Sequence, residues 1–277
     1  ASVIEHNPYI DKLYTTGDSL ADVLPKLKQE NYDYVIDLHH NLRTLKVKSA
    51  LGKKAFSFNK LNWEKFLMVN FKLNKLPQKH IVERYFETVS SLGVVNDGLG
   101  LDYFIAEKDK LSVSESLPAN FQHGYHVLVA GGSYYTKQIP ANKLKEICGL
   151  SSKPLVLLGG KEDSIIAEQV YAAFKETTIN LCGKLSLNQS ASLIEQAQTV
   201  ITSDTGLMHI AAAYKKDIIS VWGNTIPEFG MGPYMAGENS QIWEIKGLSC
   251  RPCSKLGYKK CPKGHFRCMN DIKVTSV

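Results

Sequence analysis

The sequence has no long hydrophobic run, and no apolar stretch reaches the roughly 18 residues that a membrane-spanning helix needs. It also has no low-complexity tract, and with 44% apolar and 22% charged residues its composition is that of a folded protein. No nucleic-acid-binding motif accompanies the net charge of +6. This mild, dispersed positive charge therefore favours anionic ligands or an anionic membrane surface over nucleic acid.

Cysteine is scarce outside the C-terminal segment, which holds four of the six: Cys250, Cys253, Cys261 and Cys268. Cys250 and Cys253 have the spacing of a zinc knuckle, and four thiolates can bind Zn²⁺ tetrahedrally. In a reducing cytosol, disulfides are not expected. Structural zinc and free packed thiols both remain open. We favour free thiols and expect no cofactor.

Strand and helix patterns alternate along the whole chain. Short apolar runs predict strands over residues 12–15, 34–38, 55–58, 126–130, 155–158, 179–182, 200–203 and 218–222. Periodicity predicts helices over residues 20–30, 42–51, 78–92, 142–148, 163–174, 188–197 and 207–214. Strands that alternate with helices indicate βαβ units around parallel sheets, so we expect an α/β fold.

A mixed-charge segment with Ser and Pro, residues 108–122, is the best candidate for a linker. It divides the chain into an expected first domain of residues 1–118 and an expected second domain of residues 119–277. Each half carries the alternating pattern, which predicts two Rossmann-like domains that face each other across a cleft. We expect the ligand in that cleft.

The most informative stretch is residues 199–233. A buried-strand pattern ends there at Asp204-Thr205-Gly206, and a helix of small residues follows, with His209 in its first turn. Open α/β sheets bind ligands at the carboxyl ends of their strands, and a helix N-terminus there attracts phosphate through free N–H groups and the helix dipole. Thr205 can add a hydroxyl, Gly206 permits close backbone approach, and His209 can reach a phosphate one turn on.

The Asp-Thr-Gly motif has two other interpretations. Aspartic proteases carry it after an apolar strand, but they need two such aspartates to share a proton, and this chain has one. The motif can also be an ordinary capped helix, with Asp204 as the N-cap and His209 merely packed in the core. On the motif alone, this second alternative stays open.

The residues after the motif add specificity. After the helix come an apolar strand and the spaced residues Gly223, Thr225, Pro227 and Gly232-Pro233. Together these elements resemble the lipopolysaccharide heptosyltransferases of glycosyltransferase family nine, and the resemblance spans nearly the whole chain. It implies a type B glycosyltransferase fold and transfer of a heptose from ADP-L-glycero-D-manno-heptose to the lipopolysaccharide inner core. The implied location is cytoplasmic, peripheral at the inner face of the inner membrane.

Two alternatives to this function remain: a family member that uses another nucleotide sugar, and a nucleotide-sugar-binding module without catalysis. The implied partners are an ADP-sugar donor and a lipopolysaccharide acceptor, with no nucleic acid. No metal is expected, because Lys137, Ser133 and the helix N-terminus at Thr205 would replace a divalent ion in stabilising the departing diphosphate.

Turns after several strands carry the expected donor site. Glycines after the strand at 126–130 allow backbone approach to a diphosphate, and Lys137 adds a positive charge. The alternative is an ordinary loop with a solvated lysine, and Ile139 departs from the tryptophan common in the family. The resemblance assigns catalysis to Lys137 and Asp204. It assigns donor binding to Gly132, Ser133, Lys137, Glu162, Leu185, Asp204, Thr205, Gly206 and His209.

In the first half, the resemblance assigns acceptor binding to Asn41, Arg43 and Arg84. A lipopolysaccharide core presents carboxylates and phosphates, which guanidinium groups bind through paired hydrogen bonds. A solvated basic face is the alternative, since surface arginines are common.

Residues 63–72 mix aromatic side chains with lysines at helical spacing. Such a helix can dock on an anionic membrane surface. An aromatic stripe at helical spacing is more often part of a core, however, and we favour the core for this one.

The resemblance also concerns the N-terminus. Family members begin with a strand and a Gly-Asp turn, whose aspartate would deprotonate the acceptor hydroxyl. From the size of such a domain we expect about sixty residues before Ala1 to be missing and the N-terminal domain to be incomplete. Gly17-Asp18 follows the wrong strand to be that turn. The general base is therefore expected upstream of Ala1, and Asp37 is a candidate only by its position after a strand.

Overall fold

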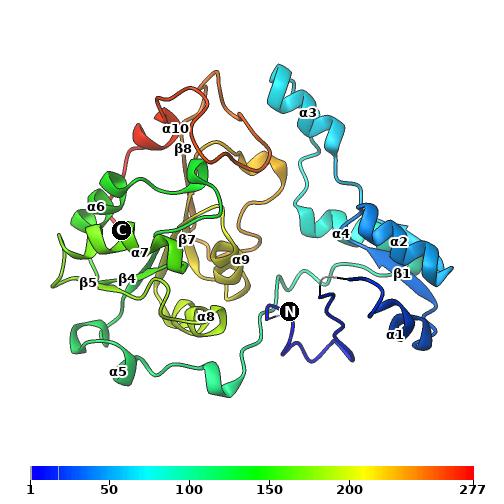
Figure 1. Cartoon of the computed structure of the whole chain (residues 1–277). Coiled ribbons are helices and arrows are strands. Elements are labelled where there is room, and N and C mark those ends of the chain that lie inside the picture. Colours follow the sequence, from blue (N-terminus) through cyan, green and yellow to red (C-terminus); the bar gives the residue numbers. More distant parts are fainter. Residues whose placement is uncertain (1, 18) are drawn as a thin grey trace.

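The apolar runs of the second half form a six-stranded parallel sheet (Figure 1). This computed structural model describes residues 2–17 and 19–277, so Asp18 of the Gly17-Asp18 turn lies outside the described residues. The strand order is β5-β4-β3-β6-β7-β8. The strands are β3 (His126–Val129), β4 (Leu155–Leu158), β5 (Thr178–Asn180), β6 (Thr199–Ser203), β7 (Asp217–Trp222) and β8 (Gln241–Glu244).

The direction in which strands are added reverses between β3 and β6. His126 of β3 lies opposite Leu155 of β4 on one side and opposite Thr199 of β6 on the other. From β3 the chain builds outward to β5, then returns to β6 and builds outward to β8. The loops at the carboxyl ends of β3 and β6 therefore lie side by side at the switch point, where such sheets bind ligands.

Helices cover both faces of this sheet. One cluster of buried side chains packs with α6 and α7, and a second packs with α8 and α9. Leu128 of β3 belongs to the first cluster, whereas its neighbour Val127 belongs to the second. With both faces buried, the strands become continuous apolar runs that are visible in the sequence. The helices are α6 (Ala141–Leu150), α7 (Ser164–Tyr171), α8 (Leu187–Gln196) and α9 (Gly206–Ala213).

Within the described residues, the first half forms a two-stranded parallel sheet with its own helices (Figure 1). Tyr34 of β1 lies opposite Lys54 of β2. We call this part the two-stranded body and the larger sheet with its helices the six-stranded body. The elements of the two-stranded body are α1 (Leu24–Gln29), β1 (Tyr34–Asp37), α2 (Leu42–Leu51), β2 (Lys54–Ser57), α3 (Asn62–Phe71) and α4 (Ile81–Val89).

Short helices complete the described chain. None of the helices formed by the described residues has the length and apolar character needed to span a bilayer. The short helices are α5 (Val113–Ser116), α10 (Arg267–Asn270), and the 3-10 helices η1 (Ser90–Leu92), η2 (Glu107–Asp109), η3 (Ala119–Phe121), η4 (Tyr135–Lys137), η5 (Lys161–Asp163) and η6 (Pro227–Phe229).

Several sequence-based predictions for the elements are wrong. Residues 12–15 form no strand. The helix predicted from residue 20 begins at Leu24, because Pro25 is accommodated only in the first turn of a helix. Tyr34, in a strand predicted to be buried, is 49% exposed, since a sheet of two strands has too little area to bury both faces. The pattern also missed β8, an edge strand whose first two residues are exposed.

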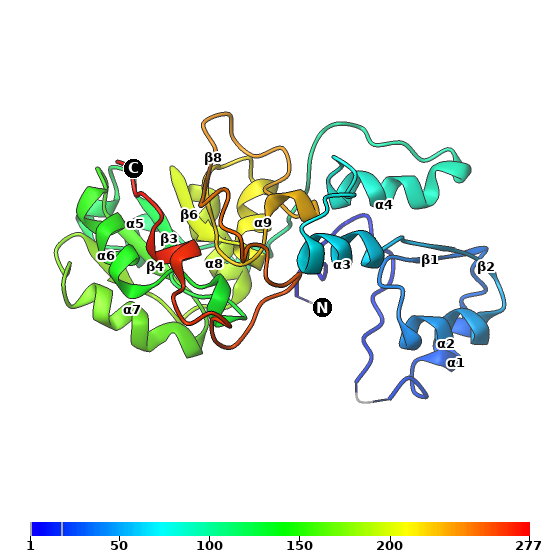
Figure 2. The same ribbon diagram turned by 90° about the horizontal axis from the view of Figure 1, so that it is seen from above.

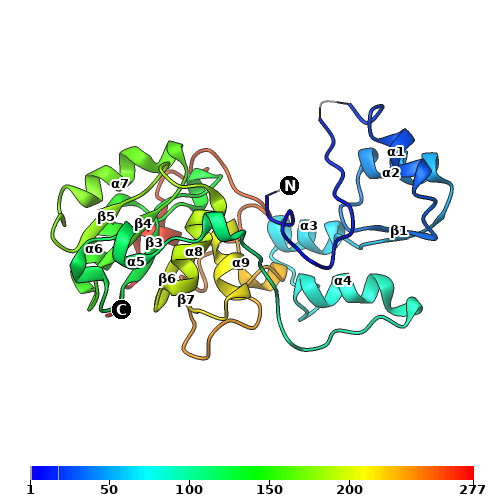
Figure 3. The same ribbon diagram turned by 90° about the horizontal axis from the view of Figure 1, so that it is seen from below.

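The predicted linker packs against the six-stranded body. The N–H of Leu111 donates to Ser192 Oγ on α8 at 2.9 Å, and just before the linker the hydroxyl of Tyr103 donates to Asn188 Oδ1 on the same helix at 2.8 Å. Leu117 is buried in the cluster that packs with α8 and α9. The domain boundary itself stays a prediction. The N–H of Ile81, at the start of α4, donates to Gly230 O at 2.8 Å, directly after η6. Figure 3 shows the short orange helix of this segment between α9 and α3.

Candidate functional site

The turns that follow β3, β4 and β6 line one cavity of about 320 Å³. A cavity of this size lies at the lower end of the range for small-molecule sites. Six of the predicted donor-binding residues line it, although they come from four separate segments: Gly132, Ser133, Glu162, Leu185, Thr205 and Gly206. The switch point of the sheet thus brings the sequence-predicted residues together, while their roles in binding stay predictions.

The N-terminus of α9 opens at this cavity without a side-chain cap. Thr205 is the N-cap residue, and its side chain makes no capping hydrogen bond. By contrast, α8 has a complete capping box from Ser186 and Gln189. The first N–H groups of α9 are therefore available to an anion. The alternative in which Asp204 caps this helix is wrong, because Thr205 occupies that position.

Gly206 begins α9 at the cavity wall. A Cβ built on this glycine would meet no other atom within 4 Å, so the fold has room for a side chain here. A side chain would instead occupy the space through which a ligand approaches the N–H groups of the first turn.

Lys137 and Asp204 form an ion pair beside the cavity. Lys137 Nζ lies 2.6 Å from Asp204 Oδ2, and the two side chains are 16% and 11% exposed. Asp204 Oδ2 also accepts a hydrogen bond from Thr225 Oγ1 at 3.2 Å. Asp204 therefore holds an ammonium group, carried on the η4 turn, at the edge of the site. Residues that lie far apart in the sequence meet in this pair.

His209 lies one turn into α9 and is half-buried. Burial lowers the pKa of His209, and the charges of His80 and Lys137 lower it further, while Asp204 acts in the opposite direction. The imidazole is therefore neutral at pH 7 and can hydrogen-bond a ligand but adds no positive charge.

Asp163 supports the glycine turns, and its role was missed in the sequence. Its Oδ2 accepts the N–H of Gly160 at 2.8 Å. A Cβ on Gly131 would lie 1.8 Å from the same oxygen, so only glycine fits there. Burial raises the pKa of Asp163, against the lowering effect of the N–H groups of Gly160 and Gly132. Asp163 is the N-cap residue of α7 by position, but its side chain caps the preceding turn η5 instead of that helix.

Arg251, within the Cys250-Arg251-Pro252-Cys253 motif, holds the loop after β7. Its Nε donates to Gly223 O at 2.7 Å and its Nη2 donates to Thr225 O at 2.9 Å. Nη2 also pairs with Glu244 Oε2 at 2.6 Å, with both side chains buried. Because Thr225 contacts Asp204, Arg251 fixes the geometry behind the Lys137–Asp204 pair. The cysteine spacing drew attention to this segment, but nothing in the sequence assigned the arginine a partner.

The C-terminal cysteines show no preformed metal site. Cys250 Sγ lies 3.9 Å from His265 Nε2, and burial raises the pKa of the Cys268 thiol to about 12. Among the residues that the structure describes, no group of three or more His, Cys, Asp or Glu side chains is arranged to hold a metal ion. That the thiols stay free in solution remains a prediction.

The predicted acceptor residues lie in different environments. Asn41 Oδ1 accepts the N–H of Thr44 at 2.9 Å and so caps α2, while Arg43 is exposed. Arg84 is buried, with its guanidinium 4.9 Å from the centre of the Phe58 ring. A Cβ on Gly230 of the six-stranded body would lie 3.5 Å from Arg84 Nη1, so Arg84 reaches the boundary between the bodies. Their part in acceptor binding stays a prediction.

His80 connects the two bodies. Its Nδ1 accepts the N–H of Val82 at 3.2 Å at the start of α4, which leaves Nε2 to donate to Gly232 O at 2.9 Å. The ring also stacks on Tyr234 with centroids 4.6 Å apart. Burial lowers the pKa of His80, so the neutral form that makes both bonds is favoured. The loop that carries Gly232 and Tyr234 therefore joins the six-stranded body to the start of α4.

Asp37 is built into the turn after β1. Its Oδ1 accepts the N–H groups of His39 and His40, and its Oδ2 pairs with Lys48 Nζ at 2.8 Å. Burial alone would raise the pKa of Asp37, but Lys48 and the N–H groups outweigh it and hold that pKa well below its usual value. A carboxylate held in this way is a weak proton acceptor, which argues against Asp37 as the general base.

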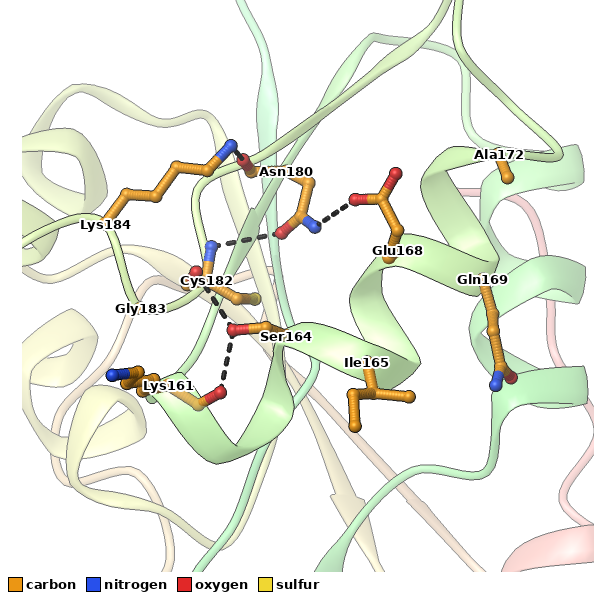
Figure 4. A pocket seen from close by; sticks show the side chains of 10 residues that line it. All are labelled: Lys161, Ser164, Ile165, Glu168, Gln169, Ala172, Asn180, Cys182, Gly183 and Lys184. Carbon is orange, nitrogen blue, oxygen red and sulfur yellow. Dashed lines mark hydrogen bonds between the residues drawn. The ribbon is translucent and has the colours of Figure 1, made fainter.

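A larger and shallower hollow of about 740 Å³ lies beside β5 and α7 (Figure 4). Its polar groups bond to one another: Lys184 Nζ donates to Asn180 O at 2.7 Å, and Asn180 Nδ2 donates to Glu168 Oε2 at 2.9 Å. Ser164 Oγ donates to Lys161 O at 2.7 Å. Because these groups are already paired, the hollow offers a ligand fewer unpaired hydrogen-bonding groups than the cavity at the switch point.

A switch point where a cavity meets an uncapped helix N-terminus, with a lysine paired to the residue before that N-terminus, has the features that suit a phosphorylated ligand. With a second α/β body beside that cavity, the fold is that of the type B glycosyltransferases. The chain belongs to glycosyltransferase family 9 (heptosyltransferase), which it matches over residues 21–260. The expected family and fold class are thereby confirmed, and the aspartic protease alternative is wrong.

Known proteins extend this comparison. Lipooligosaccharide heptosyltransferase 2 of Campylobacter jejuni is 31% identical over 126 residues, which are 44% of this chain and 38% of that protein. The aligned stretch is thus less than half of the relative's length. A family 9 glycosyl transferase from Veillonella parvula superposes with a TM-score of 0.67 at 23% identity, over 87% of this chain and 73% of that one. An Escherichia coli heptosyltransferase solved with ADP superposes with a TM-score of 0.57 at 24% identity, over 82% and 72%.

Proposed function

We propose that this protein transfers a heptose from ADP-L-glycero-D-manno-heptose to the inner core of lipopolysaccharide. The observation that supports this most directly is the cavity at the switch point, which the uncapped N-terminus of α9 lines, with the Lys137–Asp204 pair directly before that N-terminus. ADP as the nucleotide is suggested by the E. coli relative with that ligand. In this proposal residues 119–277 bind the donor and residues 1–118 face the acceptor.

The donor would bind with its diphosphate on the first turn of α9. Thr205 and Gly206 then supply backbone N–H groups, and Lys137 turns from Asp204 toward the phosphate oxygens. These groups are fixed before reaction and stabilise the negative charge that develops on the leaving ADP, which is the largest catalytic effect in many enzymes. Glu162 is exposed at the cavity, and its carboxylate would accept hydrogen bonds from the hydroxyl groups of the ribose. Leu185, partly buried against the core, would pack on the base.

The acceptor would lie between the bodies, near the loop that carries Gly232. Arg84 and His80 approach this loop from the two-stranded body. A guanidinium group suits the carboxylates and phosphates of an inner-core oligosaccharide. Arg43, on α2, is exposed and would bind such groups. The side chain of Asn41 caps the N-terminus of α2.

Two alternatives make different predictions. A family member with another sugar donor would be stabilised more by UDP- or GDP-sugars than by ADP-sugars in a thermal-shift panel, since a ligand stabilises the state that it binds. A binding module without catalysis would be stabilised by ADP-heptose, yet would not transfer heptose when supplied with acceptor.

The test of the donor site is Gly206→Val. The valine side chain has room in the fold but blocks the approach of phosphate, so we expect ADP affinity to fall at least about 100-fold while the circular dichroism spectrum stays unchanged. Gly17→Val is the matched control, because a Cβ there also meets no atom within 4 Å. Calorimetry measures both affinities. An unchanged affinity in Gly206→Val would place the nucleotide elsewhere.

A further inference from the structure

Helix α3 carries aromatic side chains in solvent. Trp63 is 66% exposed, Phe66 46% and Phe71 60%, and no residue of the helix is buried. The three rings touch: Trp63 stacks on Phe66 at 5.6 Å, and Phe66 meets Phe71 edge-on at 5.9 Å. We call these three residues the aromatic face. The prediction that this stripe belongs to a core is therefore wrong, and a contiguous exposed apolar patch of this kind marks an interaction surface.

The orientation of α3 is fixed by hydrogen bonds at its two ends. Lys72 Nζ donates to Pro252 O at 2.6 Å, and Lys255 Nζ donates to Asn62 Oδ1 at 3.2 Å. These two hydrogen bonds join both ends of α3 to the C-terminal segment. Figure 2 shows the orange-red ribbon of that segment reaching α3. Trp63 and Phe66, one turn apart, share a face of the helix, and both rings stay exposed beside these contacts. The aromatic face is consequently held outward.

Positive charge is concentrated around α3 in the sequence and in the C-terminal segment that is bonded to this helix. Residues 60–75 contain four lysines and one acidic residue, Glu64, and residues 250–266 contain four lysines, Arg251 and no acidic residue. Burial lowers the pKa of Lys65 to about 8, and the nearby charges of Arg84, Lys255 and Lys60 contribute to this shift. Arg251 is paired with Glu244, but no ion pair among the described residues involves the lysines of these two segments. These lysines therefore favour an anionic partner for the aromatic face.

We propose that the aromatic face of α3 and the lysines of the two segments dock on an anionic lipid bilayer. Trp and Phe side chains insert at the level of the headgroups, and lysines around them contact lipid phosphates. This inference rests on the proposed function only in that the acceptor is a membrane lipid. Docking would hold the boundary between the two bodies close to that membrane.

Tryptophan fluorescence tests the proposal without donor or acceptor. Of the three tryptophans, Trp222 and Trp243 are buried, so Trp63 reports on the surface. We expect vesicles of phosphatidylcholine with about 30% phosphatidylglycerol to shift the emission to shorter wavelength, and vesicles of phosphatidylcholine alone to have a much smaller effect. Salt should weaken the binding.

Variants distinguish vesicle binding through the aromatic face from nonspecific binding. The double variant Trp63→Ser/Phe66→Ser should lose at least about tenfold in vesicle affinity by flotation, as should Lys75→Glu/Lys259→Glu. Ile165→Ser and Lys175→Glu, at exposed positions of the six-stranded body, should bind vesicles like the wild type. All variants should keep wild-type ADP affinity, which shows that they fold.

Three results would overturn the proposal. One is the absence of binding to anionic vesicles at low salt, and another is vesicle binding that the Trp63→Ser/Phe66→Ser variant retains in full. The third is a concentration-dependent dimer in sedimentation without lipid that this variant abolishes, which would assign the aromatic face to a second copy of the chain. Each of these leaves heptose transfer to a soluble acceptor fragment untouched, so failure here is distinguishable from failure of the proposed function.

Discussion

The two bodies share an alternation of strands and helices but are held together differently. In the six-stranded body, buried apolar clusters cover both faces of the sheet. In the two-stranded body, the buried apolar residues among the described positions are Val23, Phe58 and Leu61, and they are joined by two charged residues, Asp37 and Arg84. Apolar burial is the dominant favourable term in folding, so the six-stranded body is the more rigid of the two and the two-stranded body opens at lower cost.

This difference suits the proposed division of labour. Stabilisation of a leaving group depends on donors that are fixed before the reaction, and the six-stranded body supplies them from turns anchored in its core. An acceptor side held by a few ion pairs and hydrogen bonds can adjust to a large oligosaccharide. The comparison implies that a substitution in the six-stranded body should lower the stability of the whole fold. A substitution in the two-stranded body should lower stability only locally.

The largest effect is expected from Arg251→Met in the six-stranded body. The substitution leaves Glu244 buried without its partner and frees the loop that holds Thr225. Loss of one member of a buried pair costs about 3–5 kcal/mol of unfolding free energy, and ADP affinity should fall with it. Urea unfolding and calorimetry measure the two quantities.

Arg267→Met is the matched control for Arg251→Met. Arg267 pairs with Asp271 at 2.7 Å, but both side chains are largely exposed, and such surface pairs contribute less than about 1 kcal/mol. Equal losses in the two variants would mean that the ion pair of Arg251 does not organise the donor site.

A smaller, local effect is expected from Asp37→Asn in the two-stranded body. Loss of the pair with Lys48 should destabilise this body by on the order of 3 kcal/mol, seen as faster hydrogen exchange in β1 and α2, with ADP affinity unchanged. Asp33→Asn, an exposed position, should stay within about 0.5 kcal/mol of the wild type. A variant with normal exchange but much slower heptose transfer would instead identify Asp37 as the base.

The pKa of Asp37 also sets the direction of an acid effect. Because the folded pKa lies well below the unfolded value of about 3.9, the stability from this group is present above that value. It is lost as the pH falls below about 4, and Asp37→Asn should lack this part of the acid sensitivity.

A moderate effect of pH is expected in the core of the six-stranded body. His126 is buried, and burial together with the charge of Lys153 lowers its pKa. The unfolded chain then binds a proton more readily, so stability falls as the pH drops below the unfolded value of about 6.5. Between about pH 7.5 and pH 5.5, the melting temperature of His126→Phe should fall less than that of the wild type. The melting temperature of His123→Gln, a change at an exposed position, should fall as much as that of the wild type. Identical slopes in the wild type and His126→Phe would exclude this histidine.

No effect is expected from chelation. If Lys137 and the N-terminus of α9 replace a divalent ion, heptose transfer should persist in EDTA. Activity that returns only with Mg²⁺ or Mn²⁺ would contradict this prediction. Loss of folding in EDTA would instead point to a metal at the C-terminal cysteines.

The sequence was a good guide wherever the signal is local. The strands of the six-stranded body are apolar on both faces, and the glycine turns and the small-residue helix follow them directly, so β3 to β7 and six residues that line the switch-point cavity could be predicted from neighbouring positions. The edge strand β8 and the exposed strand β1 lack such a pattern. Burial in the two-stranded body depends on how few elements cover it, which no local window contains.

What the sequence determined by itself is the alternating α/β pattern, the strand–turn–helix order at Asp204-Thr205-Gly206 and the membership of family 9, since each lies in residues close together along the chain. Only the tertiary structure decided that Arg251 holds Thr225, that Thr225 and Lys137 meet at Asp204, and that the aromatic face of α3 lies in solvent. The physical reason is that an ion pair or a buried surface is a property of two partners. These partners come from distant segments, which meet only when strands and helices pack.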